Sequence, residues 1–294
     1  MKILVLGGAG YIGSHTVREL LKYGYEVVVA DNLQTGHRES IPDCVKFYEG
    51  DIRDKGFLDN LFETEKIAAV IHFAANALVG ESMVDPLKYY DNNVYGTMVL
   101  LKSMVAHKID KIVFSSSSAT YGEPKNLPIL ESDPTEPTNT YGESKLAMEK
   151  MIKWVSKIHG LKFVALRYFN ACGAHPDGKI GEHHEIETHI MPLVIQTALG
   201  QRDFVSILGT DYPTDDGTCV RDYIHVMDLA RAHILALKYL EKGNESDIFN
   251  LGNGSGYSVK EIIDAVERVS GKDFTVKTEP RRPGAPARLG ASAQ

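Results

Sequence analysis

The first half of the chain alternates short apolar runs with longer segments of helical periodicity. Short runs rich in β-branched residues are typical of buried strands. Segments in which apolar residues recur every three or four positions are typical of helices that bury one face. Strands are predicted at 2–6, 26–30, 45–49, 68–73, 111–114 and 162–167, and helices at 15–23, 86–106 and 141–159.

The order of these elements predicts an α/β fold. Strands that alternate with helices are joined by right-handed crossovers, which produce a parallel sheet covered on both faces. We therefore expect a doubly wound parallel sheet of the Rossmann type. Residues 174–220 are rich in Gly, Pro, Asp and His, whereas a helix pattern returns at 228–240 and a strand pattern at 248–251. The irregular part is the expected place for a smaller ligand-binding region.

A glycine-rich turn, GGAGYIG at 7–13, follows the first predicted strand and opens the first helix. Gly7, Gly10 and Gly13 let the backbone approach a pyrophosphate, and the helix N-terminus offers free N–H donors. Asp31 ends the second predicted strand, where a carboxylate binds both ribose hydroxyls and repels a 2′-phosphate. This pattern predicts NAD rather than NADP. Asp51, just after the third strand, is a candidate for binding the adenine amino group.

A YxxxK motif, Tyr141 to Lys145, opens the long predicted helix at 141–159. Residues four apart share a helix face, so the ammonium can lie near the phenol. A cation there, together with a positive nicotinamide ring, favours phenolate and makes Tyr141 a candidate general base. The alternative is an ordinary surface pair. A second match, Tyr121 to Lys125, contains Pro124, which disfavours a helix.

Four serines, Ser115 to Ser118, follow the strand at 111–114, at the sheet edge where ligands bind in this architecture. One of their hydroxyls is placed to hydrogen-bond a substrate oxygen beside Tyr141. The alternative is a turn that satisfies its own backbone. These motifs predict a dinucleotide-binding domain at 1–169, to which 222–252 returns. Residues 170–221 and 253–294 then form the substrate-binding region.

Composition excludes several classes of protein. The net charge is −7, the pI is about 5.9, and no Lys- or Arg-rich run is present, which argues against a nucleic-acid partner. No apolar run approaches a membrane span or a signal sequence, and the three cysteines lack disulfide or zinc spacing. We expect a cytoplasmic protein without a metal. The His- and Glu-rich segment 181–189 fits no zinc template and is expected to be a polar loop.

Further motifs extend over residues 3 to about 284. They include EGDIRD, VIHFAA, VGES, YYDNNVYGT, FSSSSATYGE, TYGESK, RYFNACGAH, DGTCVRDYIHVMDLA, NLGNG and EPRRPG. Together with GGAGYIGSHT they resemble the extended short-chain dehydrogenase/reductase family, and within it the UDP-hexose 4-epimerases. The RYFNACGAH and VRDYIHV blocks carry this resemblance more specifically than the glycine loop does.

The resemblance implies a role for individual residues. Tyr141 would be the catalytic base, with Lys145 as its partner and Ser117 as the hydroxyl that assists proton transfer. Substrate would contact Ser117, Tyr141, Asn170, His189, Arg221 and Arg282. NAD would contact Gly7, Gly10, Tyr11, Ile12, Gly13, Asp31, Asn32, Asp51, Ile52, Phe73, Ala74, Asn92, Ser115, Tyr141, Lys145 and Tyr168.

The resemblance also implies a reaction, NAD-dependent epimerisation at C4 of a UDP-hexose (UDP-glucose/UDP-galactose) through a 4-keto intermediate. It implies a homodimer formed by the helices at 92–106 and 141–159. This chain departs from the family at Ala285, where an aspartate that contacts the nucleotide is usual, and 286–294 fit the pattern poorly. We expect the C-terminus to be truncated relative to the family, which would weaken substrate binding.

Two alternatives remain open on the sequence. One is another nucleotide-sugar enzyme of the same family, a 4,6-dehydratase, a decarboxylase or a reductase. A dehydratase would be expected to carry Asp-Glu beside the active-site hydroxyl, where this chain has Ser118 and Ala119. The other is a non-enzymatic NAD-binding protein, which would tend to lose the tyrosine and lysine that this chain keeps.

Overall fold

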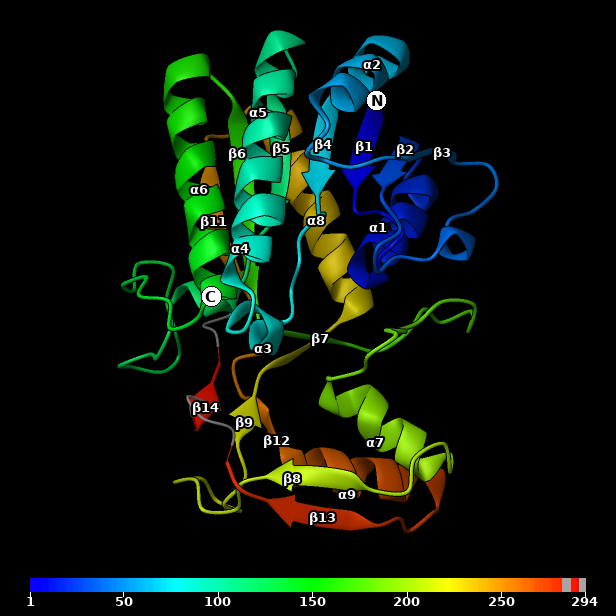
Figure 1. The fold of residues 1–294 in the computed structure, drawn as a ribbon, viewed down its shortest axis with the longest axis vertical. Helices are drawn as coiled ribbons and strands as arrows, with labels where there is room; N and C mark the ends of the chain where they lie inside the picture. Colours follow the sequence, from blue (N-terminus) through cyan, green and yellow to red (C-terminus); the bar gives the residue numbers. More distant parts are fainter. Residues whose placement is uncertain (282–286, 291–294) are drawn as a thin grey trace.

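The computed structural model describes residues 1–281 and 287–290. Within them lies a seven-stranded parallel sheet in the order β11-β6-β5-β4-β1-β2-β3 (Figure 1). Its strands are β1 Lys2–Leu6, β2 Glu26–Asp31, β3 Lys46–Glu49, β4 Ala69–His72, β5 Lys111–Ser115, β6 Lys162–Tyr168 and β11 Asp247–Leu251. The order reverses beside β1, since β2 and β3 are added on one side and β4 to β6 on the other. Doubly wound sheets bind their ligands at such a reversal.

Helices cover both faces of the sheet because its strands are apolar on both sides. In β1, Leu4 and Leu6 belong to one core and Ile3 and Val5 to the other, as side chains alternate along a strand. The first core is closed by α2, α5 and α6, and the second by α1 and α8. These helices are α1 Tyr11–Lys22, α2 Lys55–Glu65, α5 Gly96–Ala106, α6 Thr140–His159 and α8 Val226–Glu241. The predicted doubly wound fold is confirmed.

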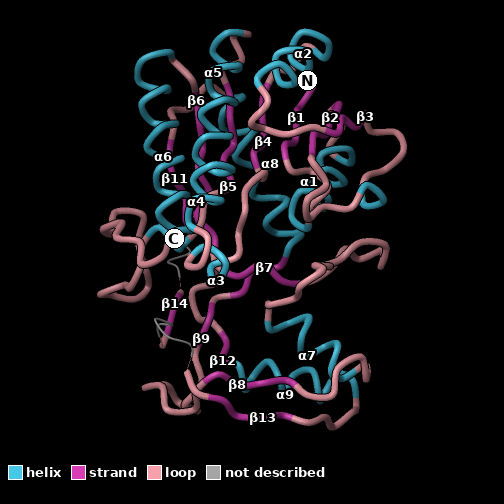
Figure 2. Tube along the Cα trace, in the orientation of Figure 1, coloured by secondary structure: helices cyan, strands magenta, loops and turns pink. Residues whose placement is uncertain are grey.

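A smaller part lies below the carboxyl ends of the sheet strands in the view of Figures 1 and 2. It has its own core, in which Val194 and Val205 pack with Val259, Ile262 and Ile263. Its elements are β7 Asn170–Cys172, α7 Ile190–Ala198, β8 Val205–Leu208, β9 Val220–Arg221, β10 Tyr223–His225, β12 Tyr257–Ser258, α9 Val259–Ser270, β13 Val276–Glu279 and β14 Arg288–Leu289. The pairs are β7 with β10, β8 with β13, and β9 with both β12 and β14.

The predicted strands of the large sheet are all present, and each end lies within one residue of its predicted position. The long helix expected at 86–106 is α4 Pro86–Tyr89, a π-helical segment Tyr90–Tyr95 and α5 in succession. Single turns occur at α3 Val79–Ser82, Arg38–Ser40 and Ser118–Thr120.

Three helices longer than one turn were not identified from the sequence, α2, α7 and α9. Both α2 and α9 have a side-chain cap that marks their start. The Asp54 side chain accepts the Phe57 N–H, and Ser258 with Glu261 forms a complete capping box. Within residues 1–281 and 287–290, no helix is both long enough and apolar enough to cross a membrane.

Candidate active site

The glycine loop joins β1 to α1 at the point where the strand order reverses. Gly7 has φ of +73°, and a Cβ there would lie 2.6 Å from the Ala74 backbone nitrogen. A Cβ on Gly13 would collide with the Gly7 carbonyl oxygen. Gly10 is the N-cap of α1 and has no side chain to cap it, so the first N–H groups of the helix remain available to an anion. The loop therefore leaves room and donors for a diphosphate.

A cavity opens beside this loop, and eight of the predicted cofactor residues line it. They are Gly7, Gly10, Asp31, Asn32, Ile52, Phe73, Ala74 and Asn92. Gln34, Thr35, Gly50, Ala75 and Asn76 line it as well and were missed from the sequence. Gly50 directly follows β3, and the other four lie three or four residues after the end of β2 or β4, which is the signal that would have found them. The position of this cavity at the strand reversal suits a dinucleotide.

Asp31 holds the glycine loop as well as lining the cavity. Its Oδ2 accepts the Ala9 N–H at 2.9 Å and its Oδ1 accepts the Leu33 N–H at 2.8 Å. Burial raises the pKa of the Asp31 carboxyl, and these two N–H donors oppose that rise. The carboxylate is thus fixed at the end of β2, where a ribose is expected.

The Asp51 carboxylate accepts hydrogen bonds from two neighbouring side chains. Arg53 donates to both of its oxygens, at 2.9 and 2.7 Å, and Asn32 donates at 3.2 Å. These bonds, the Arg53 guanidinium first, hold the pKa of Asp51 well below its usual range. Asp51 does not line the cavity described above, so its expected contact with adenine stays a prediction.

The tyrosine and lysine of the YxxxK motif lie in the first turns of α6. The Asn139 side chain caps this helix by accepting the Gly142 N–H at 2.8 Å. Lys145 Nζ donates to the Ser115 carbonyl oxygen at 2.8 Å and lies 5.8 Å from the centroid of the Tyr141 ring. The Ser117 side chain lies close enough to the Tyr141 phenol to lower its pKa. The structure therefore brings all three predicted catalytic residues together.

Burial affects the charged forms of the tyrosine and the lysine. It raises the pKa of the Tyr141 phenol, and the neighbouring Ser117 hydroxyl opposes that rise. Burial also lowers the pKa of Lys145 to about 7, while the nearby charge of Glu149 opposes that fall. In both side chains the loss of surrounding water therefore disfavours the charged form.

Behind the catalytic group lies a buried network that the sequence did not suggest. Glu149 accepts two bonds from Arg167, at 2.9 and 2.6 Å, and one from the Ser116 hydroxyl at 2.5 Å. Glu149 and Arg167 are 1% and 3% exposed. The Arg167 guanidinium also stacks 4.7 Å from the Tyr121 ring centroid. Glu149 lies one helical turn after Lys145, and this spacing was the available signal.

Ser115 and Tyr168 meet at the ends of β5 and β6, where their hydroxyls are 2.6 Å apart. Burial raises the pKa of the Tyr168 phenol. Besides Asp51, seven of the predicted cofactor residues do not line the cavity beside the glycine loop. They are Tyr11, Ile12, Gly13, Ser115, Tyr141, Lys145 and Tyr168. They lie in the first turn of α1, at the ends of β5 and β6, and at the start of α6.

The glycine loop and the group of Tyr141, Lys145 and Ser117 lie within the part of the chain that one family model matches. The model of the NAD dependent epimerase/dehydratase family matches residues 3–252. This chain belongs to that family. The UDP-glucose 4-epimerase of Halalkalibacterium halodurans is 59% identical over 294 residues, which are 100% of this chain and 88% of that protein.

Solved structures of this family agree with the fold. A crystal structure of a UDP-glucose 4-epimerase has a TM-score of 0.98 and 57% identity, covering 100% of this chain and 89% of that one. The UDP-glucose 4-epimerase from Bifidobacterium longum, in complex with NAD+ and UDP, has a TM-score of 0.94 and 43% identity. That match covers 100% of this chain and 90% of the other.

Besides Ser117 and Tyr141, three residues expected to bind substrate lie in the smaller part, namely Asn170, His189 and Arg221. Asn170 begins β7, and its N–H donates to the Asp222 carbonyl at 3.0 Å. Arg221 lies in β9 and donates to the Val220 carbonyl at 2.8 Å. His189 is the N-cap of α7, and its Nδ1 faces Glu182 and Glu187. Arg282 and Ala285 lie outside the described residues.

Proposed function

We infer that this chain catalyses the NAD-dependent epimerisation of a UDP-hexose (UDP-glucose/UDP-galactose) at C4, through a 4-keto intermediate. Full-length similarity to UDP-glucose 4-epimerases supports the reaction. The observation that carries the chemistry is the group of Tyr141, Ser117 and Lys145 at the carboxyl end of β5, next to the dinucleotide cavity. The enzyme is an isomerase that uses NAD as its cofactor.

Each catalytic side chain has a defined task in this proposal. Tyr141 accepts the proton of the sugar O4, and the Ser117 hydroxyl beside the phenol donates a hydrogen bond to the sugar O4 and holds it in place. Lys145 is anchored to the Ser115 carbonyl with its Nζ 5.8 Å from the centroid of the phenol ring, and in its protonated form it stabilises the phenolate. Bound NAD+ supplies the hydride acceptor and a second positive charge that favours phenolate.

The smaller part is proposed as the substrate-binding region. In this proposal residues 170–221 and 253–294 hold the nucleotide sugar, and 1–169 with 222–252 hold NAD. Asn170, Arg221 and Arg282 would bind the diphosphate, because guanidinium forks suit phosphate oxygens. Three free cysteines, Cys44, Cys172 and Cys219, suit the reducing cytoplasm in which we propose that the enzyme acts.

Replacing Tyr141 with phenylalanine tests the mechanism. UDP-galactose is incubated with the purified protein without added reductant, and UDP-glucose is measured. Loss of the base should lower kcat by about 10²–10⁴-fold, while the NAD content of the protein stays unchanged. The control is Tyr90→Phe, since Tyr90 is 40% exposed. Unchanged turnover in Tyr141→Phe would refute the role of the phenol, and a product lacking water or CO2 would favour another family reaction.

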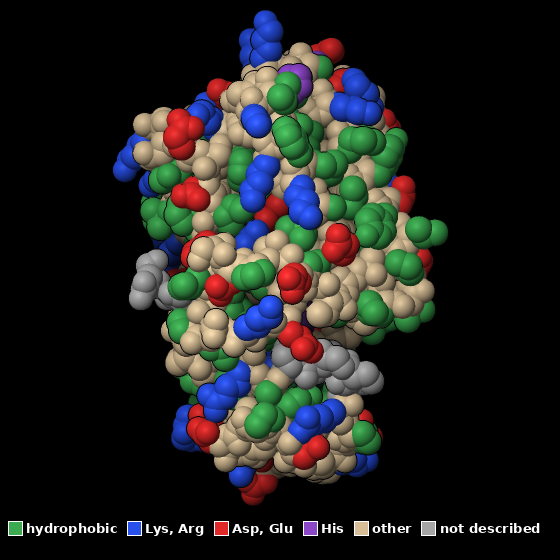
Figure 3. Space-filling view, turned by 90° about the vertical axis from the view of Figure 1, so that its left-hand side faces the viewer, with side chains coloured by type: hydrophobic (Ala, Val, Ile, Leu, Met, Phe, Trp, Pro, Cys, Tyr) green, Lys and Arg blue, Asp and Glu red, His purple; other side chains and the backbone are tan. Residues whose placement is uncertain are grey.

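We also propose a homodimer that pairs α5 and α6 with the same helices of a second copy. An open apolar groove runs between them, lined by Met98, Leu101, Lys102, Val105, Lys150, Met151, Trp154, Val155 and His159. Trp154 and Ile158 are 62% and 67% exposed. Figure 3 looks onto the side of the molecule on which α6 lies and shows hydrophobic side chains among lysines and arginines. Such exposed apolar patches mark association surfaces.

Sedimentation velocity tests the dimer. Trp154→Glu buries a charge in the interface and should give a monomer at micromolar concentration, where the wild type sediments as a dimer. Leu235→Glu is the matched control, because Leu235 is 64% exposed on α8. A wild-type monomer, or a Trp154→Glu dimer of unchanged affinity, would refute this interface.

A further inference from the structure

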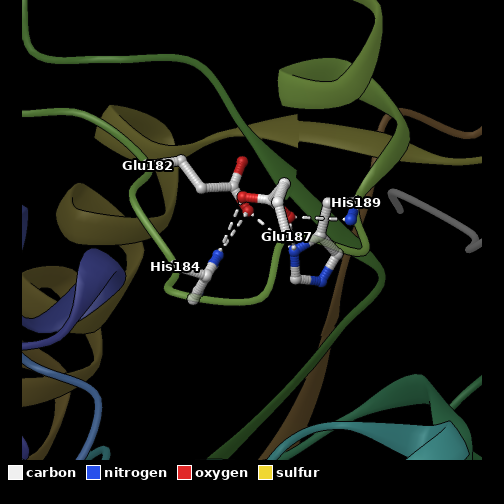
Figure 4. A group of neighbouring side chains, drawn as sticks. All are labelled: Glu182, His184, Glu187 and His189. Carbon is white, nitrogen blue, oxygen red and sulfur yellow. Dashed lines mark hydrogen bonds and ion pairs between the residues drawn. The ribbon is translucent and has the colours of Figure 1, made fainter. Parts of the chain in front are cut away.

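Four side chains of the loop between β7 and α7 converge on one point, as Figure 4 shows. They are Glu182, His184, Glu187 and His189, and one ligand atom from each lies within 4.8 Å of all the others. His189 Nδ1 is 2.8 Å from Glu182 and 3.3 Å from Glu187. His184 Nδ1 is 3.1 Å from Glu187 and 3.6 Å from Glu182. Each carboxylate thus faces both imidazoles.

The burial of the two acids makes this arrangement unusual for a surface loop. The Glu182 and Glu187 side chains are 7% and 6% exposed. In the described part of the chain, the ion-pair partners of both carboxylates are the imidazoles of His184 and His189. Two carboxylates are therefore buried close together, and both face the same two imidazoles. Buried charges of one sign need a counter-charge close by.

We propose that this group, which we call the loop cluster, binds a divalent metal ion of the zinc class. Two imidazole nitrogens and two carboxylate oxygens are a donor set that suits Zn²⁺ or Co²⁺, whereas Mg²⁺ and Ca²⁺ prefer oxygen alone. Metal–ligand distances of about 2.0–2.2 Å in a tetrahedron place neighbouring ligand atoms about 3.3–3.6 Å apart. The four acid–imidazole distances of 2.8, 3.1, 3.3 and 3.6 Å lie around this value.

The expected role of this metal is structural, because four protein ligands close a tetrahedral site. The loop cluster joins the N-cap of α7 to a loop that begins at Gly173. The Gly173 carbonyl in turn accepts the Tyr11 hydroxyl at 2.6 Å. A metal here would therefore fix the connection between the glycine loop and the smaller part. It would also occupy His189 Nδ1 and leave only Nε2 for substrate.

Cobalt binding tests the proposal independently of epimerase turnover. Protein freed of metal with a chelator is titrated with Co²⁺, whose visible absorption reports tetrahedral ligation, and Zn²⁺ is then added as a competitor. The wild type should bind one equivalent of Co²⁺. His184→Ala and Glu187→Gln should each weaken binding by at least about 100-fold, beyond the 10–100-fold typical of residues that only orient a ligand.

The same loop offers matched controls. Glu185→Gln removes an exposed carboxylate two residues from Glu187, and His183→Ala removes a histidine that pairs with His37 at 2.9 Å. Both variants should bind like the wild type, and unchanged circular dichroism checks that every variant folds. Absence of stoichiometric binding in the wild type overturns the proposal. Loss of binding in His183→Ala but not in His184→Ala also overturns it, since the metal would then belong to the His37–His183 pair.

Discussion

Replacing Glu149 with glutamine removes the negative charge that faces Arg167 inside the protein. The guanidinium donates to Glu149 Oε1 at 2.9 Å and to Oε2 at 2.6 Å, and both side chains are almost fully buried. A glutamine amide retains one acceptor oxygen but presents an NH2 group to the second guanidinium N–H. Arg167 would then keep its charge in a dry environment with half of its hydrogen bonds.

The expected loss of stability follows from this geometry. Breaking a buried ion pair by removing one partner costs about 3–5 kcal/mol, since the remaining charge is uncompensated. The Tyr121 ring, 4.7 Å from the guanidinium, and the remaining amide oxygen favour the lower end of that range. For a chain of this size the melting temperature should fall by roughly 6–10 °C.

The assay is urea unfolding followed by circular dichroism, with NAD at the same excess for every variant because bound ligand adds stability. Glu143→Gln is the control, since Glu143 is exposed on the same helix. Glu149→Leu combined with Arg167→Met removes both charges and should recover most of the loss. A free energy of unfolding for Glu149→Gln within about 1 kcal/mol of the wild-type value would refute the view that this pair needs both charges.

The same substitution should change the pH dependence of catalysis. The Glu149 charge raises the pKa of Lys145, which burial lowers to about 7. Removing that charge lets the pKa of Lys145 fall further, so the ammonium loses its proton at a lower pH. The alkaline limb of kcat/KM should therefore move to lower pH in Glu149→Gln and stay in place in Glu143→Gln. A limb that does not move would show that Lys145 need not be charged.

Two further substitutions test the cofactor site. Gly7→Ala places a methyl group 2.6 Å from the Ala74 nitrogen in a positive-φ position, so it should reduce the NAD retained on purification. Gly24→Ala shares the positive φ but meets nothing within 4 Å, so its NAD content should stay normal. Asp31→Asn removes the charge that repels a 2′-phosphate and should lower the NAD-over-NADP affinity ratio by at least about tenfold, as measured by competitive titration. An unchanged ratio would contradict the placement of Asp31 beside the ribose.

Local patterns in the sequence determined the sheet, the glycine loop and the helix that carries Tyr141 and Lys145. Apolar runs and glycine spacing involve only a few neighbouring residues, so they predict local structure without knowledge of the rest of the fold. The helices α2 and α9 also carry a local signal in their capping residues, Asp54 for α2 and Ser258 with Glu261 for α9, although neither helix was predicted.

Contacts between distant segments were decided only by the tertiary structure. Folding brings Lys145 to the Ser115 carbonyl and Arg167 to Glu149, and no periodicity specifies either pairing. The pKa values of Tyr141 and Lys145 depend on how much water the whole fold excludes, which residue spacing does not reveal. The loop cluster is local in sequence, yet its convergence depends on a backbone path that no repeat or template describes. Burial and long-range pairing are properties of the packed chain.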